Sequence, residues 1–324
     1  MRLILAPMEG LADAPLRDVL TRIGGIDLCV AEFVRVTDHL VPRQKFLRTV
    51  PELDNGGRTP NGTPVRVQLL GHDVACLAEN AALAAGLGAP GIDLNFGCPS
   101  PSVNRHGAGA ILLREPERLF AIVAAVRRAL PAEIPLSAKM RLGVDDTDLA
   151  LDCARAVEAG GAAEITVHAR TRADRFRPPA RWEWLARIRE AVAVQVVANG
   201  DVWLPQDWAH IRAVSGCADV MLGRGLIVRP DLARRIRAGQ DAAAMPWQEL
   251  LPWIVDHYRQ LCRAPNPRHA PGRLKQWLGM LRAAYPEAAV LHRELRLLHD
   301  PAQVARRLER AGDECAQEEL KILR

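Results

Sequence analysis

Aromatic residues and long apolar runs are both scarce in this chain of 324 residues. Phe, Trp and Tyr together make up 4% of the sequence. No apolar run approaches the roughly 20 residues that a membrane-spanning helix needs. The apolar stretch over residues 1–7 is too short for a signal peptide and fits a first strand instead. We therefore expect a protein without a membrane segment.

Cysteine and glycine patterns that mark redox, metal or dinucleotide sites are also missing. The seven cysteines contain no CxxC pair and no cluster with the spacing of metal ligands. Such a set is typical of a reduced, cytoplasmic protein, so we expect a cytoplasmic location and no metal. No GxGxxG turn occurs, which argues against a doubly wound dinucleotide-binding fold. Nothing in the sequence requires a dimer, and we expect a monomer.

What is present is ordinary globular composition, with 49% hydrophobic and 25% charged residues. Eight short β-rich runs alternate with helical stretches such as residues 119–130, 149–159 and 182–191. This alternation predicts an α/β fold, a (β/α)8 TIM barrel. The eight runs are residues 3–6, 28–31, 65–70, 92–95, 136–140, 164–168, 195–198 and 219–222.

Beyond about residue 240 the strand pattern stops and four helices are predicted, at residues 246–262, 273–284, 287–298 and 301–310. We therefore predict a barrel domain over residues 1–240 and a small helical domain over 241–324. Between Arg259 and Arg310 the chain has ten arginines and one lysine against four acidic residues. This excess predicts a polyanionic partner, and a solvated basic face is the alternative.

Polar residues gather at the carboxyl ends of the predicted strands, which in a barrel all face one mouth. A buried polar group without a partner costs about 1–3 kcal/mol, so such a ring indicates a bound ligand. Glycine-containing turns follow the seventh and eighth strands, the usual phosphate site of a barrel, and predict a phosphate-bearing cofactor. The residues expected at the mouth are Pro7, Met8, Glu32, Arg35, Gln68, Asn95, Cys98, Lys139, Arg141, His168, Asn199, Gly223 and Arg224.

Cys98 lies on a turn constrained by Gly97 and Pro99, just past the fourth predicted strand. A cysteine in that setting is a candidate reactive group, whereas a cysteine taken at random is more often an inert core residue. The segment from Ser100 to Ala110 is long for a connector and predicts an active-site loop.

Lys139 interrupts a β-run at an inward position, where a lysine is rarely tolerated without an anion. His168 alone would suit a core histidine, but beside Lys139 and Asn199 it indicates a ligand contact. Glu32 and Arg35 could contact a ligand at the mouth, and the alternative is that they form an ion pair with each other. Phe176, flanked by two arginines in an aromatic-poor chain, suits stacking on a base or anchoring of the loop.

The chain contains the segments Ala6-Pro7-Met8-Glu9-Gly10, Asn95-Phe96-Gly97-Cys98-Pro99, Gly107-Ala108-Gly109-Ala110, Lys139-Met140-Arg141, Val167-His168-Ala169-Arg170-Thr171, Asn199-Gly200-Asp201 and Gly223-Arg224-Gly225. Together, over about residues 3–230, these segments resemble the flavin-dependent tRNA-dihydrouridine synthases, the Dus family. Residues 271–277, PGRLKQW, resemble its bacterial C-type branch, which the family associates with uridine 16 of the tRNA D-loop. Ala169 departs from the glycine that many relatives carry.

The resemblance implies FMN at the barrel mouth, NADPH as electron donor and reduction of the uridine 5,6 double bond. Hydride would pass from flavin N5 to uracil C6, and Cys98, as a protonated thiol, would protonate C5. Lys139 would offset the negative charge of reduced flavin. The implied FMN-binding residues are Pro7, Met8, Glu9, Gln68, Lys139, His168, Asn199, Gly200, Asp201, Gly223 and Arg224.

A stacked uridine cannot reach such a pocket, so it must flip out, and basic contacts to the RNA must offset a few kcal/mol. The candidate RNA contacts are Arg35, Asn95, Arg141, Phe176, Arg273, Lys275, Arg282, Arg293 and Arg296. Two alternatives stay open: an FMN enzyme like dihydroorotate dehydrogenase acting on a free pyrimidine, which needs no basic helices, and an RNA-binding barrel without catalysis.

Overall fold

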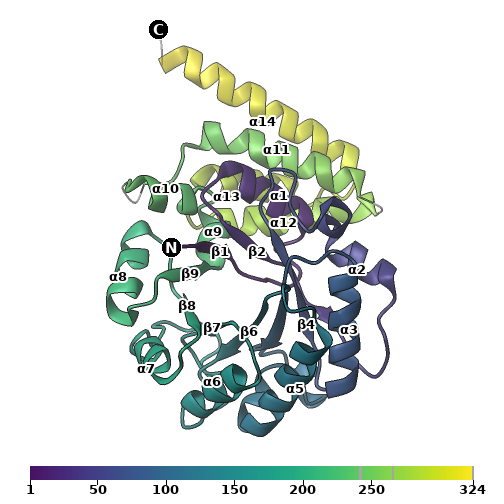
Figure 1. Cartoon of the computed structure of the whole chain (residues 1–324). Coiled ribbons are helices and arrows are strands. Elements are labelled where there is room, and N and C mark those ends of the chain that lie inside the picture. The colour runs from purple at the N-terminus through teal and green to yellow at the C-terminus, as the bar shows by residue number, and fades with distance from the viewer. Residues whose placement is uncertain (241–242, 265, 323–324) are drawn as a thin grey trace.

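The computed structural model describes residues 1–240, 243–264 and 266–322, and its centre is a closed ring of eight parallel strands (Figure 1). Pairings of β1 with β9 and of β2 with β4 close the ring. All eight predicted strands are present, so the predicted barrel is confirmed. The strands of the ring are β1 (Leu3–Leu5), β2 (Leu28–Val30), β4 (Val65–Leu70), β5 (Ile92–Phe96), β6 (Leu136–Arg141), β7 (Glu164–His168), β8 (Gln195–Asn199) and β9 (Asp219–Leu222).

One further strand, β3 (Val34–Arg35), pairs with β4 beside the ring. It was not predicted, because two residues carry no periodicity. The ring strands are almost continuously apolar or buried, as β4 and β7 show, because helices cover the outside and side chains fill the inside.

Helices surround the ring, and Figure 1 shows α3, α5, α6, α7 and α8 as an outer layer. Aspartate caps begin two of them, with the carboxylates of Asp13 and Asp73 accepting from backbone amides of the first turn. The helices before residue 240 are α1 (Ala14–Ile23), α2 (Arg43–Thr49), η1 (Pro51–Asn55), α3 (Val74–Gly86), α4 (Pro101–Arg105), η2 (Gly109–Arg114), α5 (Pro116–Ala129), α6 (Ala150–Ala159), α7 (Glu183–Ala191), α8 (Pro205–Ser215), α9 (Arg224–Val228) and α10 (Leu232–Ala238).

The C-terminal helices gather on the α1 side of the barrel, and the end of α14 runs away from it (Figure 1). They are α11 (Trp247–Arg263), η3 (Pro267–His269), α12 (Ala270–Leu281), α13 (Pro286–Leu295) and α14 (Pro301–Ile322). The four predicted helices are therefore present, with α14 longer than predicted.

These helices share one continuous apolar core with the barrel. The indole Nε1 of Trp277 in α12 also donates to the carbonyl of Ile227 in α9, at 3.1 Å. The division at residue 240 stays a prediction, since the predicted boundary adjoins residues 241–242, outside the described residues. Among the helices described, none combines the length and apolarity needed to cross a bilayer.

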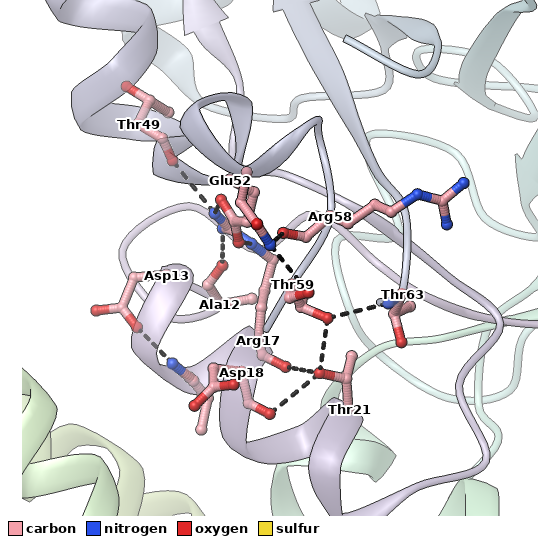
Figure 2. Close-up of polar contacts among 12 residues, drawn as sticks. Ala12, Asp13, Arg17, Asp18, Thr21, Thr49, Glu52, Arg58, Thr59 and Thr63 are labelled. Carbon is pink, nitrogen blue, oxygen red and sulfur yellow. Dashed lines mark hydrogen bonds and ion pairs between the residues drawn. The ribbon is translucent and has the colours of Figure 1, made fainter. Parts of the chain in front are cut away.

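A buried ion pair fixes α1 against η1 (Figure 2). Arg17 is fully buried, and its Nε and Nη2 donate to the carboxylate of Glu52, each at 2.8 Å. Its Nη1 donates to the carbonyl of Ala12, also at 2.8 Å. Ala12 belongs to the loop that leads from β1 to α1, so this pair anchors a loop at the barrel mouth.

Replacing Glu52 by Ala should lower the free energy of unfolding by about 3–5 kcal/mol, because the buried guanidinium of Arg17 loses its counter-charge. Urea denaturation monitored by circular dichroism measures this. Glu115→Ala is the control, since it breaks the more exposed Glu115–Arg118 pair and should cost no more than about 1 kcal/mol. Equal losses in the two variants would contradict the role given to Arg17 and Glu52.

Candidate active site

A cavity of about 480 Å³ opens at the carboxyl ends of the strands, a size usual for cofactor sites. All the predicted FMN-binding residues line it, together with Cys98 and three predicted RNA contacts, Asn95, Arg141 and Phe176. Lining residues come from the loops after β1, β2, β5, β7, β8 and β9, and helix α12 adds one residue, Gln276. The structure therefore brings the predicted catalytic and cofactor residues together.

Strand register explains why these residues meet. Lys139 of β6 pairs with Asn95 of β5, while His168 of β7 pairs with Arg141 on one side and Asn199 on the other. Lys139 and Arg141 are two residues apart on β6 and therefore point to the same side of the strand. The register consequently places these polar residues in two successive rows at the carboxyl ends of the strands.

A chain of side-chain amides shapes the turn that carries Cys98. The Oδ1 of Asn95 accepts hydrogen bonds from the backbone amides of Gly97 and Cys98, at 3.0 and 2.9 Å. Its Nδ2 donates to Oε1 of Gln68, whose Nε2 donates to Asp93. Asn95 thus positions Cys98, and Gln68 orients Asn95.

The loop after Cys98 is tied to the same residue. The carbonyl of Cys98 accepts from Nδ2 of Asn104 at 2.9 Å and from the amide of Ala110 at 3.1 Å. Gly109 has a φ of +71°, and a Cβ there would lie 2.8 Å from that carbonyl oxygen, so a side chain is excluded. The predicted active-site loop contains the short helix α4 and holds the Cys98 backbone in place.

Cys98 lines the cavity, and the pKa of its thiol lies above the usual value, which favours the protonated form. Burial raises its pKa, and the nearby carboxylate of Glu9 adds to this, against the opposite effects of the Ser100 amide and Arg141. A thiol with a raised pKa is a poor nucleophile and a usable proton donor.

Cations accumulate in the cavity without matching carboxylates. Arg170 forms an ion pair with Asp201. Arg141 instead donates to the carbonyls of Gly97, Thr171 and Arg175, and it forms no ion pair among the described residues. Lys139 has neither a hydrogen bond nor an ion pair within the described residues.

The pKa values reflect this excess. Burial, together with the charge of Arg141, lowers the pKa of Lys139 to about 8. Burial and Arg170 lower the pKa of Arg141 to about 10. His168 is neutral, because burial and then Lys139 hold its pKa well below the usual range. A bound anion would stabilise the charged forms of these basic groups and raise their pKa values again. Lowered pKa values of several basic groups in one cavity therefore indicate an anion-binding site.

The ring of Phe176 lies against the guanidinium groups of two arginines, Arg141 and Arg224. Its ring centroid is 5.3 Å from the guanidinium carbon of Arg141 and 4.8 Å from that of Arg224. The residue is 49% exposed while it lines the cavity. The arginine contacts anchor the loop, and the exposed part of the ring leaves the predicted base stacking as a prediction.

Arg273 is placed differently from the expected basic face. Its guanidinium donates to Asp13 at 2.6 and 3.0 Å and to the carbonyl of Gly10. The amide of Gly10 donates in turn to Glu32. Glu32 therefore holds the β1–α1 loop, and the alternative of a Glu32–Arg35 ion pair has no support among the described residues.

The other predicted RNA contacts lie outside the cavity. Arg35, Arg282, Arg293 and Arg296 are exposed. Lys275 is partly exposed, and its Nζ donates to the carbonyl of Arg296 at 3.1 Å. These residues remain available to a polyanion, whereas Arg273 is occupied within the protein.

Among the polar and aromatic residues that line the cavity, Arg170, Trp203 and Gln276 had no role assigned from the sequence. Arg170 lies two residues after His168, and the sequence does not predict its ion pair with Asp201. Trp203 follows the predicted phosphate turn. Gln276 gave no signal, because only the packing of α12 on the barrel brings it to the mouth.

Alkylation of Cys98 by iodoacetamide should stay slow at pH 8 and accelerate only above pH 9, because its pKa is raised and the thiolate is the reacting form. Peptide mass spectrometry across a pH series measures the rate. Glu9→Gln should move the profile to lower pH, since one cause of the shift is removed. Rapid alkylation already at pH 7 would contradict the protonated state.

The sequence matches the family model described as Dihydrouridine synthase (Dus) over residues 4–320. A protein of Pseudomonas putida named tRNA-dihydrouridine(16) synthase is 56% identical over 311 residues, covering 95% of this chain and 96% of the relative. A protein of Ralstonia nicotianae with the same name is 53% identical over 312 residues, covering 96% of each.

Solved structures with a similar fold include morphinone reductase in complex with tetrahydroNAD, with a TM-score of 0.51 and 14% identity over 76% of this chain and 89% of that one. Histamine dehydrogenase from Rhizobium sp. 4-9 gives a TM-score of 0.56 and 14% identity, covering 80% of this chain and 48% of that one. At this identity the likeness concerns the barrel fold alone.

Proposed function

The chain belongs to the dihydrouridine synthase family, and from this premise we propose that it reduces a uridine of the tRNA D-loop to 5,6-dihydrouridine, using FMN and NADPH. The observation that carries the proposal is the single cavity that holds both a protonated thiol, Cys98, and an unpaired ammonium, Lys139. The names of the relatives favour uridine 16. Because tRNA is the substrate, we place the activity in the cytoplasm.

FMN fits the residues at the mouth. Lys139 lacks a partner and would bind the pyrimidine edge of the flavin, where negative charge resides after reduction. A Cβ at Gly223 would have no atom nearer than 3.9 Å outside its chain neighbours, so the backbone there is open to a phosphate. The guanidinium of Arg224, which has no ion pair among the described residues, would add a charge-assisted contact. When bound, FMN supplies hydride.

Cys98 is the proton donor of the proposed reaction. Its thiol donates to uracil C5, and Asn95, through the backbone amides of Gly97 and Cys98, keeps the thiol aimed at the cavity. Arg141, fixed by three backbone carbonyls, would bind a uracil carbonyl. Phe176 above it would limit access of water to the flipped base.

The direct test uses the purified protein with an unmodified tRNA transcript, FMN and NADPH. Nucleoside mass spectrometry should show uridine converted to a product heavier by two hydrogens, and fragment mapping should place it at position 16. Omission of NADPH is the control. An oxidoreductase for free pyrimidines would act on orotate or uracil instead, and a non-catalytic scaffold would yield no product from either.

Cys98→Ala should keep FMN and slow the reaction with tRNA by about 10²–10⁴-fold, because general acid assistance is lost. Stopped-flow absorbance of the reduced enzyme mixed with tRNA measures the rate. Cys76→Ala, which removes a partly exposed cysteine outside the cavity, is the matched control and should react at the wild-type rate. A wild-type rate in Cys98→Ala would remove the cysteine from the mechanism.

The affinity of the apoprotein for FMN should fall about tenfold between pH 7 and pH 9, because Lys139, with a pKa of about 8, is charged below that pH and neutral above it. Isothermal titration calorimetry measures the affinity. Lys139→Arg keeps its charge and should bind FMN almost independently of pH, whereas Lys139→Met should bind weakly throughout. A decline of the same size in Lys139→Met would assign the pH dependence to another group.

Joint replacement of Arg282, Arg293 and Arg296 by Ala should weaken tRNA binding and flatten its salt dependence by about two units of log–log slope, since each phosphate contact contributes about 0.7–0.9. Filter binding over a salt series measures the slope. Arg118→Ala, on α5 away from the helical region, is the charge control. An unchanged slope in the triple variant would make these residues a solvated face.

Arg273→Ala should behave differently, because Arg273 holds the β1–α1 loop against α12. We expect reduced FMN retention and an unchanged salt slope. A reduced slope with full FMN content would instead make Arg273 an RNA contact, as the sequence suggested.

A further inference from the structure

A second hollow, the side groove, adjoins the active-site cavity and measures about 460 Å³. Two residues, Trp203 and Arg224, line both hollows, so the groove begins where the cavity ends. Its far wall comes from α12, the turn after it and α13. The lining residues are Trp203, Arg224, Val228, Gly279, Met280, Arg282, Ala283 and Ala289.

Residues on one face of α12 line both the active-site cavity and the side groove. Gln276 lines the active-site cavity, while Met280 and Ala283 line the side groove. These three residues are spaced i, i+4 and i+7, which places them along one side of a helix and its C-terminal turn. The helix therefore forms a continuous wall that leads from the cavity into the groove.

The side groove combines a flat aromatic ring, an apolar floor and positive charge. Trp203 presents its indole, and the guanidinium carbon of Arg224 lies 5.2 Å from the ring centroid. Arg282 is exposed at the groove, and no acidic residue is among the lining residues. A base with an attached phosphate matches this set, because bases stack on aromatic rings and phosphates bind arginine.

The geometry points to the side groove as a subsite for the nucleotide next to the reacting uridine in the same RNA. This inference rests on the proposed function. A uridine that enters the cavity draws its covalently joined neighbour to the rim, and the rim at Trp203 and Arg224 is where the groove starts. Exposed Arg293 and Arg296 extend the positive surface from α12 to α13, as a continuing RNA strand requires.

Filling the groove without changing charge tests the subsite. Ala289→Trp places a large ring in the groove and leaves both arginines intact. Ala302→Trp, at an exposed position on α14, is the matched control. Each protein is assayed for dihydrouridine formation with full-length tRNA and with tRNAs carrying one abasic nucleotide at either neighbour of the reacting uridine.

For the wild type and Ala302→Trp, removal of one neighbouring base should lower kcat/KM about 5- to 100-fold, the range expected for loss of one base stacked on an aromatic ring. Ala289→Trp should show a loss of similar size with intact tRNA, and no further loss when that base is removed. FMN content and reduction by NADPH should match the wild type. Ala283→Trp, at an exposed groove position, should repeat the result if Ala289→Trp folds poorly.

Two results would overturn the subsite. One is wild-type activity in both groove-filled variants, or losses that multiply with those of the abasic tRNAs. The other is slower reduction by NADPH with unchanged reaction of tRNA, which would assign the groove to the nicotinamide dinucleotide. Absence of dihydrouridine with wild-type protein would instead refute the proposed function, so the two failures are distinguishable.

Discussion

Uncompensated positive charge in a partly closed cavity is the constraint on which the rest of this site depends. Lys139, Arg141 and Arg224 lie in or at one cavity without an ion pair among the described residues, and burial lowers the pKa of each. Desolvated cations that also repel one another are unfavourable unless a ligand supplies negative charge. An anionic cofactor satisfies this requirement, and a polyanionic substrate at the rim satisfies it further.

Neutral groups hold one of these cations, Arg141, and the turn that carries Cys98. Arg141 is held by backbone carbonyls, and the chain from Asp93 through Gln68 to Asn95 directs the Cys98 turn. The thiol consequently stays protonated although cations surround it, because burial and Glu9 outweigh them. Proton donor and anion-binding groups can therefore share one cavity at neutral pH.

The barrel and most of the residues at its mouth could be predicted from the sequence. Strands buried on both faces gave short apolar runs, and the polar residues that ended them had to meet at one mouth because parallel strands share a direction. The position of Cys98 followed from its Gly/Pro turn. Strand β3 was missed because two residues have no period. Helix α14 was predicted to end at residue 310, although Ala311 and Cys315 continue the spacing of Val304 and Leu308 and pack with the core.

Contacts between segments that are far apart in the chain could not be predicted from the sequence. Arg273 and Arg282 stand close together in a basic stretch, yet one pairs with Asp13, near the opposite end of the chain, and the other is exposed. Periodicity predicts which side of a helix is apolar, but not which barrel loop the helix meets. The same limit concealed Gln276 and the side groove, which exist only because α12 packs beside the mouth.

The proposed function requires the cavity to select its flavin by negative charge. Isothermal titration of the apoprotein with FMN and with riboflavin, which lacks the phosphate, tests this directly. Charge-assisted hydrogen bonds are worth about 1.5–3 kcal/mol each, so FMN should bind at least about tenfold more tightly for each such contact. Equal affinity for the two flavins would contradict the claim that the guanidinium of Arg224 and the open backbone at Gly223 hold a phosphate.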